Sequence, residues 1–353
     1  MSDKTVVVVG QHELDYPRNV VNQRLLRGAG YRLELVHSRA PGLLREALLL
    51  RGMERMKRRA DAFFLTEGSH RFVPLVRTVA RRRNTPVLFD PFTSKYGTHV
   101  EDRRRYSPRS PGALRCWWMD YSAVRSADHI LFDTAEHRDY FDRRYRLRGP
   151  SHILEVGVDE TVFAPQPRTS APTFRVLFYG TYIPLQGVEH ILAAAKALED
   201  RPDIQFTLIG RGQTYDEVRR TAGHLPHVRF VGPVPPTALV AAVRESDLCL
   251  GIFGATEKAG NVVPNKVVQA AAMGRPIVTR RSSAIERYFP PDGGAVLVSP
   301  GDGHALAAAI RALADDRGRL GSLADGARRV FEQHFSEAAL TQKMAEILRR
   351  AGV

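Results

Sequence analysis

Short apolar runs alternate with longer amphipathic segments along the whole 353-residue chain. This alternation is typical of βαβ units, in which crossover helices join buried parallel strands. In the first half, the apolar runs predict strands at Thr5–Gly10, Tyr31–His37, Ala60–Leu65, Pro86–Asp90 and Asp128–Asp133. Apolar residues at helical spacing predict helices at Pro17–Arg27, Leu43–Arg59 and Phe72–Arg83. The first half is therefore expected to form a doubly wound α/β domain.

The second half repeats the same alternation. The predicted strands are Phe174–Gly180, Ile204–Gly210, Val228–Gly232, Leu248–Phe253, Pro276–Thr279 and Ala295–Val298. The predicted helices are Gly187–Glu199, Thr214–Ala222, Pro236–Glu245, Pro264–Met273 and Asp302–Ala314. The last segment, Ser336–Arg350, has apolar residues at helical spacing beyond the final strand. We expect this helix to cross back to the first domain.

A stretch with three prolines, residues 163–173, separates the two series and continues neither a helix nor a strand. The expected parts are an N-terminal domain at 1–165, a C-terminal domain at 166–335 and a C-terminal helix at 336–353. Two Rossmann-like domains would face each other across a cleft, at the sheet edges where such folds bind ligands. A long polar stretch, Pro91–Pro111, is expected to be a mobile loop over that cleft.

Composition narrows the class of protein. No apolar run approaches the roughly 20 residues of a membrane helix, and the first residues do not resemble a signal peptide, so we expect a cytoplasmic protein. Cys116 and Cys249 stand apart from any metal-binding or disulfide pattern. The net charge of +14 comes mostly from arginine, a bias that a GC-rich genome would also produce. It favours a positive field over a cleft that binds a diphosphate or an acidic lipid head group.

The basic segment 51–59 leaves two interpretations open. It fits a packed helix with a basic solvent face, and it also fits a peripheral contact with the inner face of a membrane. Nucleic-acid binding is the weaker interpretation of the charge, because the basic residues lie on helix faces and in one loop without interleaved aromatic residues. We therefore expect no nucleic-acid partner.

Three predicted turns at the same edge of the second sheet suit an anion. The first follows a strand at Gly180 and opens a helix at Gly187, where glycine lets a ligand approach the backbone and the helix end offers free amides. Arg211 lies in the second turn and can pair with a diphosphate. The third carries Pro264 at the start of a helix and Lys266 beside the amides of its first turn. Three such turns favour a phosphate-bearing ligand.

These residues resemble the retaining GT-B glycosyltransferases of family four. The resemblance covers the second half from Val176 to about Asp316. Its motifs are Phe178-Tyr-Gly180, Leu208-Ile-Gly-Arg-Gly212, Val231-Gly232, Pro264-Asn-Lys266 and Gln269-Ala-Ala-Ala-Met-Gly-Arg-Pro276, with Gly157-Val-Asp159 and Phe163 before the linker. The family binds a nucleotide-diphosphate sugar in its C-terminal domain. The resemblance implies that activity here.

The resemblance, together with the three turns, gives a set of donor-binding residues. They are Arg18, Gly180, Thr181, Gln186, Arg211, Asn261, Val262, Val263, Asn265, Lys266 and Gln269. This chain departs from the family at several positions. Asn261 and Gln269 stand where the family commonly has two glutamates, and Gln186 replaces its usual lysine. The amides can still bind hydroxyl groups without carrying charge.

The catalytic residues implied are Asp90, Arg211 and Lys266. Asp90 ends a strand where many members of the family have a histidine, and the two cations would stabilise the departing diphosphate. Glu67, His70 and His99 are the expected acceptor-binding residues, by the same position at strand ends. No Asp-x-Asp follows a strand, so we expect retaining transfer without a metal or other cofactor.

Other functions remain open at this stage. A GT-B sugar-nucleotide epimerase or hydrolase would need no acceptor. A dinucleotide-dependent oxidoreductase is disfavoured, because the GxGxxG spacing does not follow the first strand. A small-molecule acceptor and a lipid-linked acceptor fit equally well. The sequence does not indicate the donor base, the donor sugar or the oligomeric state.

Overall fold

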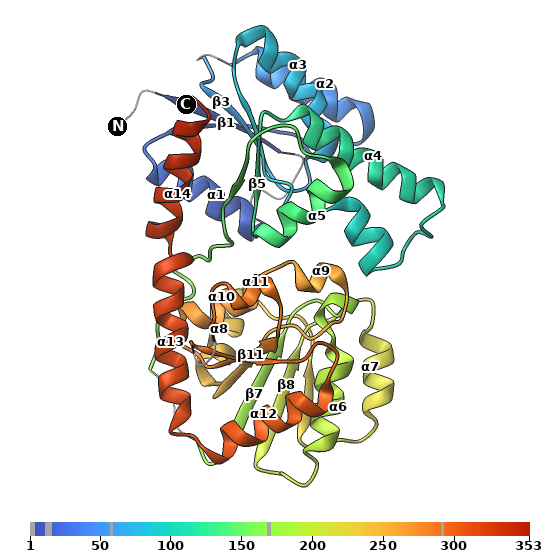
Figure 1. Cartoon of the computed structure of the whole chain (residues 1–353), viewed down its shortest axis with the longest axis vertical. Coiled ribbons are helices and arrows are strands. Elements are labelled where there is room, and N and C mark those ends of the chain that lie inside the picture. The colour runs from blue at the N-terminus through green and yellow to red at the C-terminus, as the bar shows by residue number, and fades with distance from the viewer. Residues whose placement is uncertain (1–3, 11–15, 57–58, 168–170, 291–292) are drawn as a thin grey trace. The chain divides into compact units, whose positions relative to one another are not determined.

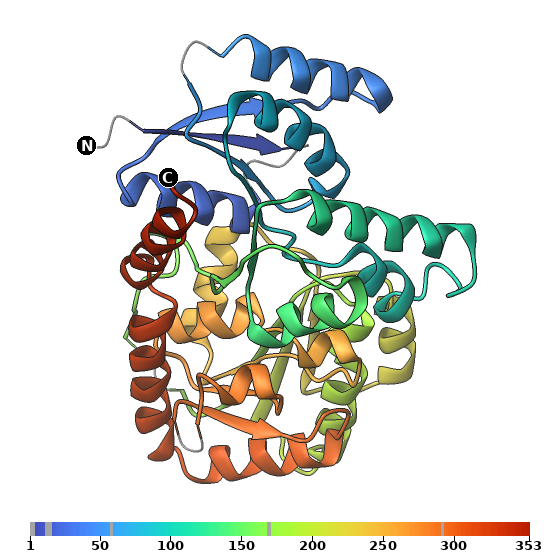
Figure 2. The same cartoon turned by 45° about the horizontal axis from the view of Figure 1, so that its top comes forward.

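The computed structural model describes residues 4–10, 16–56, 59–167, 171–290 and 293–353. The chain folds into two compact units. Unit 1 holds residues 1–157 and 337–353, and unit 2 holds residues 158–336. Each unit is a parallel sheet covered by helices on both faces (Figures 1 and 2). Asp15, the pair 57–58 of the basic segment and residues 168–170 of the expected linker lie outside the described residues.

The sheet of unit 1 has the strand order β2-β1-β3-β4-β5-β6, and its neighbouring strands are parallel. Its strands are β1 (Thr5–Gly10), β2 (Arg32–His37), β3 (Ala62–Leu65), β4 (Val87–Phe89), β5 (His129–Phe132) and β6 (Ser151–Ile153). The β-branched and aromatic residues of β1 and β3 are fully buried, as expected for strands covered on both faces. The strand order turns back between β1 and β3.

Two groups of helices cover this sheet. Side chains of α2 (Gly42–Glu54), α3 (Val73–Arg83), α4 (Pro111–Ser126) and α5 (Ala135–Tyr145) share one apolar core. Those of α1 (Pro17–Gly28) and α14 (Glu337–Arg350) share the other. α14 lies beside α1 (Figure 1), so the C-terminal helix returns to the first unit as expected. Ser110 and Thr134 cap α4 and α5, since each hydroxyl accepts a hydrogen bond from the amide three residues on.

The sheet of unit 2 has the order β12-β11-β10-β7-β8-β9, which is the strand order of a dinucleotide-binding Rossmann sheet. Its strands are β7 (Phe174–Tyr179), β8 (Ile204–Ile209), β9 (Val228–Val231), β10 (Leu248–Leu250), β11 (Ile277–Arg280) and β12 (Ala295–Val298). Its helices are α6 (Val188–Ala197), α7 (Tyr215–Ala222), α8 (Pro236–Glu245), α9 (Glu257–Gly260), α10 (Asn265–Ala272), α11 (Ser283–Glu286), α12 (Gly303–Asp315) and α13 (Arg319–His334). The order turns back between β7 and β10.

The predicted doubly wound α/β organisation is confirmed, with several differences. The helix expected at Leu43–Arg59 ends at Glu54. The segment expected as a mobile loop, Pro91–Pro111, contains a π-helical turn at Gly97–Asp102. No helix among the described residues is long and apolar enough to cross a membrane. The units divide after Gly157, whereas the sequence placed the boundary at 165.

Candidate functional site

The candidate site of unit 2 lies where the strand order turns back, at the carboxyl ends of β7 and β10. Open α/β sheets bind ligands at this point, because the loops after the two strands separate there. The loop after β7 reaches Gly187, whose φ of +64° is left-handed. A Cβ atom there would lie 2.4 Å from the amide nitrogen of Gly254, in the segment after β10. Only glycine allows this close approach.

Lys266, in the first turn of α10, extends into the same place. Its Nζ donates a hydrogen bond to Gln186 Oε1 and lies 3.8 Å from the centroid of the Phe178 ring. A Cβ atom on Gly180 would come within 2.8 Å of this nitrogen. Burial lowers the pKa of Lys266 well below its usual value, and no carboxylate among the described residues pairs with it. The site therefore holds a buried amine without a protein counter-charge.

Gln269 lies one helical turn beyond Lys266 on α10. The Tyr179 hydroxyl lies 3.0 Å from Gln269 Oε1 and 3.2 Å from the backbone oxygen of Lys266, and both oxygens can accept its proton. Burial raises the pKa of Tyr179 well above its usual value, which keeps the hydroxyl a donor. Because Oε1 accepts this bond, the Gln269 amide nitrogen can donate to a ligand.

Except for Arg18, which belongs to unit 1, the other predicted donor residues lie on neighbouring loops of unit 2. Arg211 and Thr181 are exposed, and the Arg211 guanidinium lies over the Tyr215 ring, 4.6 Å from its centroid. Asn261 follows α9, and the segment from there to α10 contains half-buried Val262, buried Val263 and half-buried Asn265. The structure thus brings Gly180, Gln186, Lys266 and Gln269 together. The other predicted donor residues of unit 2 lie on loops at the same edge of the sheet.

Arg280, at the end of β11, is a residue of this site that sequence reasoning missed. Its Nη1 donates to the backbone oxygens of Gly254, at 2.5 Å, and Thr256, at 3.3 Å. Burial lowers its pKa. The guanidinium fixes the segment that leads into α9 and Asn261. In a chain rich in arginine, only its position at a strand end distinguishes it in the sequence.

Arg18 and Asp90 form a buried pair in unit 1. Arg18 Nε donates to Asp90 Oδ2 at 2.8 Å, and its terminal nitrogens donate to the backbone oxygens of Glu155, at 2.6 Å, and Leu154, at 2.9 Å. Asn22 Nδ2 also donates to Asp90 Oδ2, at 2.6 Å. All three nitrogens of the Arg18 guanidinium are used inside the unit. Its role in donor binding, and the catalytic role of Asp90, stay predictions.

His70 and Asp120 lie in a second buried polar cluster of unit 1. His70 Nε2 is 3.5 Å from Asp120 Oδ1, and burial lowers the His70 pKa well below its usual value. Asp120 accepts hydrogen bonds from the hydroxyls of Ser94 and Tyr145 and from the amides of Lys95 and Tyr96. Burial raises the pKa of Asp120. The carboxylate anchors the segment after β4, and His70 supports that anchor.

Glu67 and His99, the other expected acceptor residues, are half-buried. Glu67 follows β3, and His99 lies on the π-helical turn after β4. Both therefore occupy the edge of the sheet that the sequence indicated, whereas His70 is fully buried beneath it.

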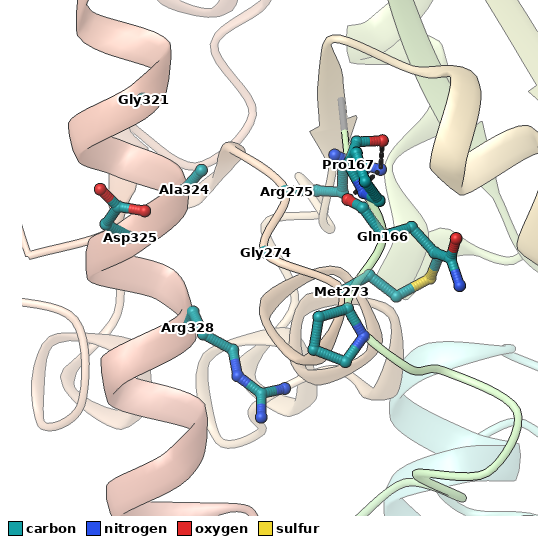
Figure 3. A pocket seen from close by; sticks show the side chains of 10 residues that line it. Gln166, Pro167, Met273, Gly274, Arg275, Gly321, Ala324, Asp325 and Arg328 are labelled. Atoms are coloured by element: carbon teal, nitrogen blue, oxygen red, sulfur yellow. Dashed lines mark hydrogen bonds between the residues drawn. The ribbon is translucent and has the colours of Figure 1, made fainter. Parts of the chain in front are cut away.

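A cavity of about 420 Å³ lies elsewhere in unit 2, between residues 165–167, the turn after α10 and helix α13 (Figure 3). Figure 3 shows Arg275 directed toward Gln166 and Pro167. Its Nη2 donates to their backbone oxygens, at 3.0 and 3.3 Å, and its Nε donates to the backbone oxygen of Val243. None of the predicted donor residues lines this cavity. Arg275 therefore links the start of the connecting segment to helix α8.

Residues 173–316 match the family model described as glycosyl transferases group 1. This range contains the whole candidate site of unit 2. Residues 173–316 are therefore similar to glycosyl transferases group 1.

Several curated relatives are similar to this chain. A phosphatidyl-myo-inositol mannosyltransferase of Mycolicibacterium smegmatis is 32% identical over 222 residues, which cover 60% of this chain and 56% of the relative. A D-inositol 3-phosphate glycosyltransferase of Corynebacterium glutamicum is 30% identical over 240 residues, 63% of this chain and 56% of the relative. The chain spans about half the length of the curated relatives it matches.

Solved structures give the fold. Sucrose-phosphate synthase from Thermosynechococcus elongatus has a TM-score of 0.77 at 16% identity, over 98% of both chains. Anabaena Alr3699/HepE in complex with UDP has a TM-score of 0.72 at 16% identity, over 98% of this chain and 100% of that one. These likenesses show a GT-B fold, as the sequence predicted.

Proposed function

We propose that this protein is a glycosyltransferase that moves a sugar from a nucleoside diphosphate sugar to an acceptor hydroxyl, with retention of configuration and without a required metal ion. The observation that carries the proposal is the buried amine of Lys266 at the turning point of the strand order, which has no counter-charge among the residues that the structure describes. A buried cation is costly unless an anion accompanies it. A diphosphate would supply that anion.

The surrounding backbone suits the same ligand. Lys266 lies in the first turn of α10, where helix amides have no intrahelical partner and the helix dipole favours negative charge. Gly180 and Gly187 keep side chains away from the path of the phosphates. Gln269 and Asn261 present neutral amides, which suit the hydroxyls of a ribose or a sugar.

The reaction does not require a protein side chain as a general base. The bond between the anomeric carbon and the diphosphate oxygen breaks, and a bond from that carbon to the acceptor oxygen forms on the same face. The acceptor proton passes to the departing diphosphate. Lys266, Arg211 and the helix amides would stabilise the negative charge that develops on this leaving group.

Known proteins support a hexose donor. The curated relatives include mannosyltransferases, and Anabaena Alr3699/HepE was solved with UDP and with UDP-glucose. A first test is a thermal-shift screen against UDP, GDP, TDP and their common sugar conjugates, since a ligand that binds only the folded state raises the melting temperature. We expect a clear shift with one nucleotide.

A matched pair of variants locates the binding site. Lys266→Gln should abolish most of the shift, because it removes the buried charge, whereas Lys196→Gln, on the exposed side of α6, should leave it unchanged. Equal shifts in both variants would contradict the assignment of Lys266.

Product analysis tests the reaction itself. With donor and an accepted acceptor, the product should keep the anomeric configuration of the donor in its NMR coupling constants, and EDTA should not reduce the rate. Turnover of the donor alone to a free sugar or an epimer would favour the hydrolase or epimerase instead.

A further inference from the structure

A second cavity, of about 380 Å³, lies within unit 1 among elements at the carboxyl ends of β3 and β4. Five cationic side chains line it, and none of its lining residues is acidic. They are Arg45 on α2, Arg71 after β3, Lys95 and Arg105 after β4, and Arg115 on α4. We call this site the basic cavity. It occupies the sheet edge at which parallel α/β units bind ligands.

Two of these five cations have a partner within unit 1. Arg71 pairs with Glu46, and Arg45 Nε donates to the backbone oxygen of Ala40 at 2.6 Å. For Lys95, Arg105 and Arg115, no carboxylate among the described residues forms an ion pair. Like charges that converge on one concave surface repel one another and attract a counter-ion. Arginine forks and a lysine ammonium are the groups that bind phosphate oxygens best.

The cavity is built on a fixed framework. Asp120 Oδ1 accepts a hydrogen bond from the Lys95 amide at 2.9 Å, which holds that residue in place from beneath. The ring of Tyr106 lies against the first turn of α4, where a Cβ atom on Gly112 would approach it to 2.5 Å. The helix end adds its own partial positive charge to the cavity.

The backbone around the cavity is also unusual. His99 lies on the π-helical turn Gly97–Asp102, and π-helical turns occur frequently at functional sites. Phe92 and Arg104, which flank the segment, adopt positive φ angles of 54° and 49°. Side chains other than glycine rarely adopt such angles, and residues that do are concentrated at ligand sites.

We propose that the basic cavity binds the phosphate group of a phosphorylated acceptor. This inference rests on the proposed glycosyltransferase function and specifies its acceptor, which would carry a phosphate ester rather than being a neutral alcohol. Lys95, Arg105 and Arg115 bind the phosphate oxygens. His99 and Tyr106 line the cavity beside them and contact the rest of the acceptor.

The phosphate has two sources, a soluble phosphate ester or the head group of a lipid. Of the six large hydrophobic side chains that are exposed among the described residues, five lie on α2 and α4, which contribute Arg45 and Arg115. They are Leu43, Leu44 and Leu48 on α2, and Leu114 and Trp118 on α4. Apolar side chains beside a basic site suit an anionic membrane surface. The experiment therefore needs an arm for each source.

The soluble arm uses glucose 6-phosphate and glucose as probes, in a Lys266→Gln background that suppresses phosphate binding in unit 2. Titration calorimetry at constant ionic strength should show binding of glucose 6-phosphate only. Arg115→Gln or Lys95→Gln should weaken it about tenfold, because each removes one charge-assisted phosphate contact. Arg109→Gln, an exposed arginine of the same segment that does not line the cavity, is the matched control and should have no effect.

The lipid arm measures sedimentation of the protein with phosphatidylcholine vesicles. A second set of vesicles contains about 30% phosphatidylglycerol, which makes the surface anionic. Binding that needs the anionic lipid and is lost in Arg115→Gln, but not in Arg109→Gln, supports a lipid-linked phosphate. Binding of glucose 6-phosphate with the same variant pattern supports a soluble one. Binding of neither probe, or equal losses in Arg115→Gln and Arg109→Gln, overturns the proposal.

The nucleotide screen separates this result from the proposed function. Arg115→Gln lies in unit 1 and should keep the full thermal shift with the donor nucleotide. If that shift is absent even in the unaltered protein, the transferase function fails. If the shift is present and phosphate binding is not, only the basic cavity assignment fails.

Discussion

Arg18 in unit 1 and Lys266 in unit 2 are both buried cations, and both were predicted from the sequence to bind the donor. The partners that surround these two side chains differ. Arg18 is surrounded by one carboxylate and two backbone oxygens. Lys266 has one neutral amide oxygen and an aromatic ring. A buried cation that the protein neutralises holds the fold together, whereas one that it leaves without a counter-charge is suited to bind an anion.

The same distinction applies to the basic cavity. Its arginines are partly exposed, so that water lowers the cost of their charge in the absence of ligand. Lys266 lacks that help, and its pKa falls as a result. To bind an anion, unit 2 would therefore use one desolvated amine and backbone amides. Unit 1 would use several solvated charges. The predictions below test this contrast, from the largest expected effect to the smallest.

The largest effect is expected from Asp90→Asn. Asp90 is fully buried, and among the described residues it is the one carboxylate that pairs with Arg18. Removing its charge leaves the guanidinium uncompensated, which should reduce the free energy of unfolding by about 3 kcal/mol. Urea denaturation followed by circular dichroism measures this loss.

The exposed pair Arg138–Asp139 provides the control. Both side chains are in contact with solvent, so Asp139→Asn should change the free energy of unfolding by less than about 1 kcal/mol. If Asp90→Asn were as stable as this control while turnover disappeared, Asp90 would be a catalytic residue and not a partner of Arg18.

In the protein without ligand, Lys266→Met should change the free energy of unfolding in the opposite direction. It replaces a buried amine with an apolar side chain of similar length, so the free energy of unfolding should rise by about 2 kcal/mol, while nucleotide binding is lost. Denaturation in the absence of nucleotide, followed by the thermal-shift assay with it, measures the two effects. Loss of stability in Lys266→Met would place Lys266 with Arg18 as a structural cation.

The pKa of Lys266 also predicts a dependence on pH. Because its folded pKa is lowered, the unfolded chain binds more protons than the folded chain between that pKa and the usual value of 10.5. Stability without ligand should therefore rise with pH over this range. The diphosphate prefers the protonated amine, so nucleotide affinity should fall as pH rises, and this fall should be absent in Lys266→Met.

Much of the fold was predictable because its signals are local. The strands and most helices of unit 2 were found from apolar runs bounded by glycine and proline, and their observed ends differ from the predicted ones by a few residues. The segment after β4 was harder. Its polar, arginine-rich sequence looks like a loop, and its π-helical turn depends on Asp120, a residue some 20 positions later that accepts the Ser94, Lys95 and Tyr96 hydrogen bonds.

The candidate sites show the same limit. Gly180, Gln186 and Lys266 were found because glycine and proline mark the turns on which they lie. The sequence could not show that Lys266 is unneutralised and Arg18 is neutralised, since that depends on Asp90, 72 positions away from Arg18. The basic cavity was missed for the same reason. Its cations come from four segments, and in a chain with 52 basic residues none of them is conspicuous alone.

The smallest effect is expected from His152→Asn, which tests how a buried pair of histidines affects stability. His152 on β6 and His129 on β5 lie side by side, with His129 Nδ1 3.0 Å from His152 Nε2. Burial, and then the charge of His129, lower the pKa of His152 from 6.5 to about 4. One of the two nitrogens must be unprotonated to accept the bond, so the pair is stable only while at least one ring is neutral.

The sign of the pH effect follows from this lowered pKa. Between pH 6.5 and about 4 the unfolded chain binds more protons at this residue than the folded chain, so its contribution to stability is lost as the pH falls through that window. His152→Asn should make the acid-induced loss smaller, by about 1 kcal/mol at pH 5 after allowance for solvent screening of a partly exposed pair. Urea denaturation at pH 7.5 and pH 5 measures the difference.

His224→Asn, on the exposed turn after α7, should show the same pH dependence as the unaltered protein. If His152→Asn also behaved like the unaltered protein, the histidine pair would contribute nothing to the acid sensitivity of unit 1.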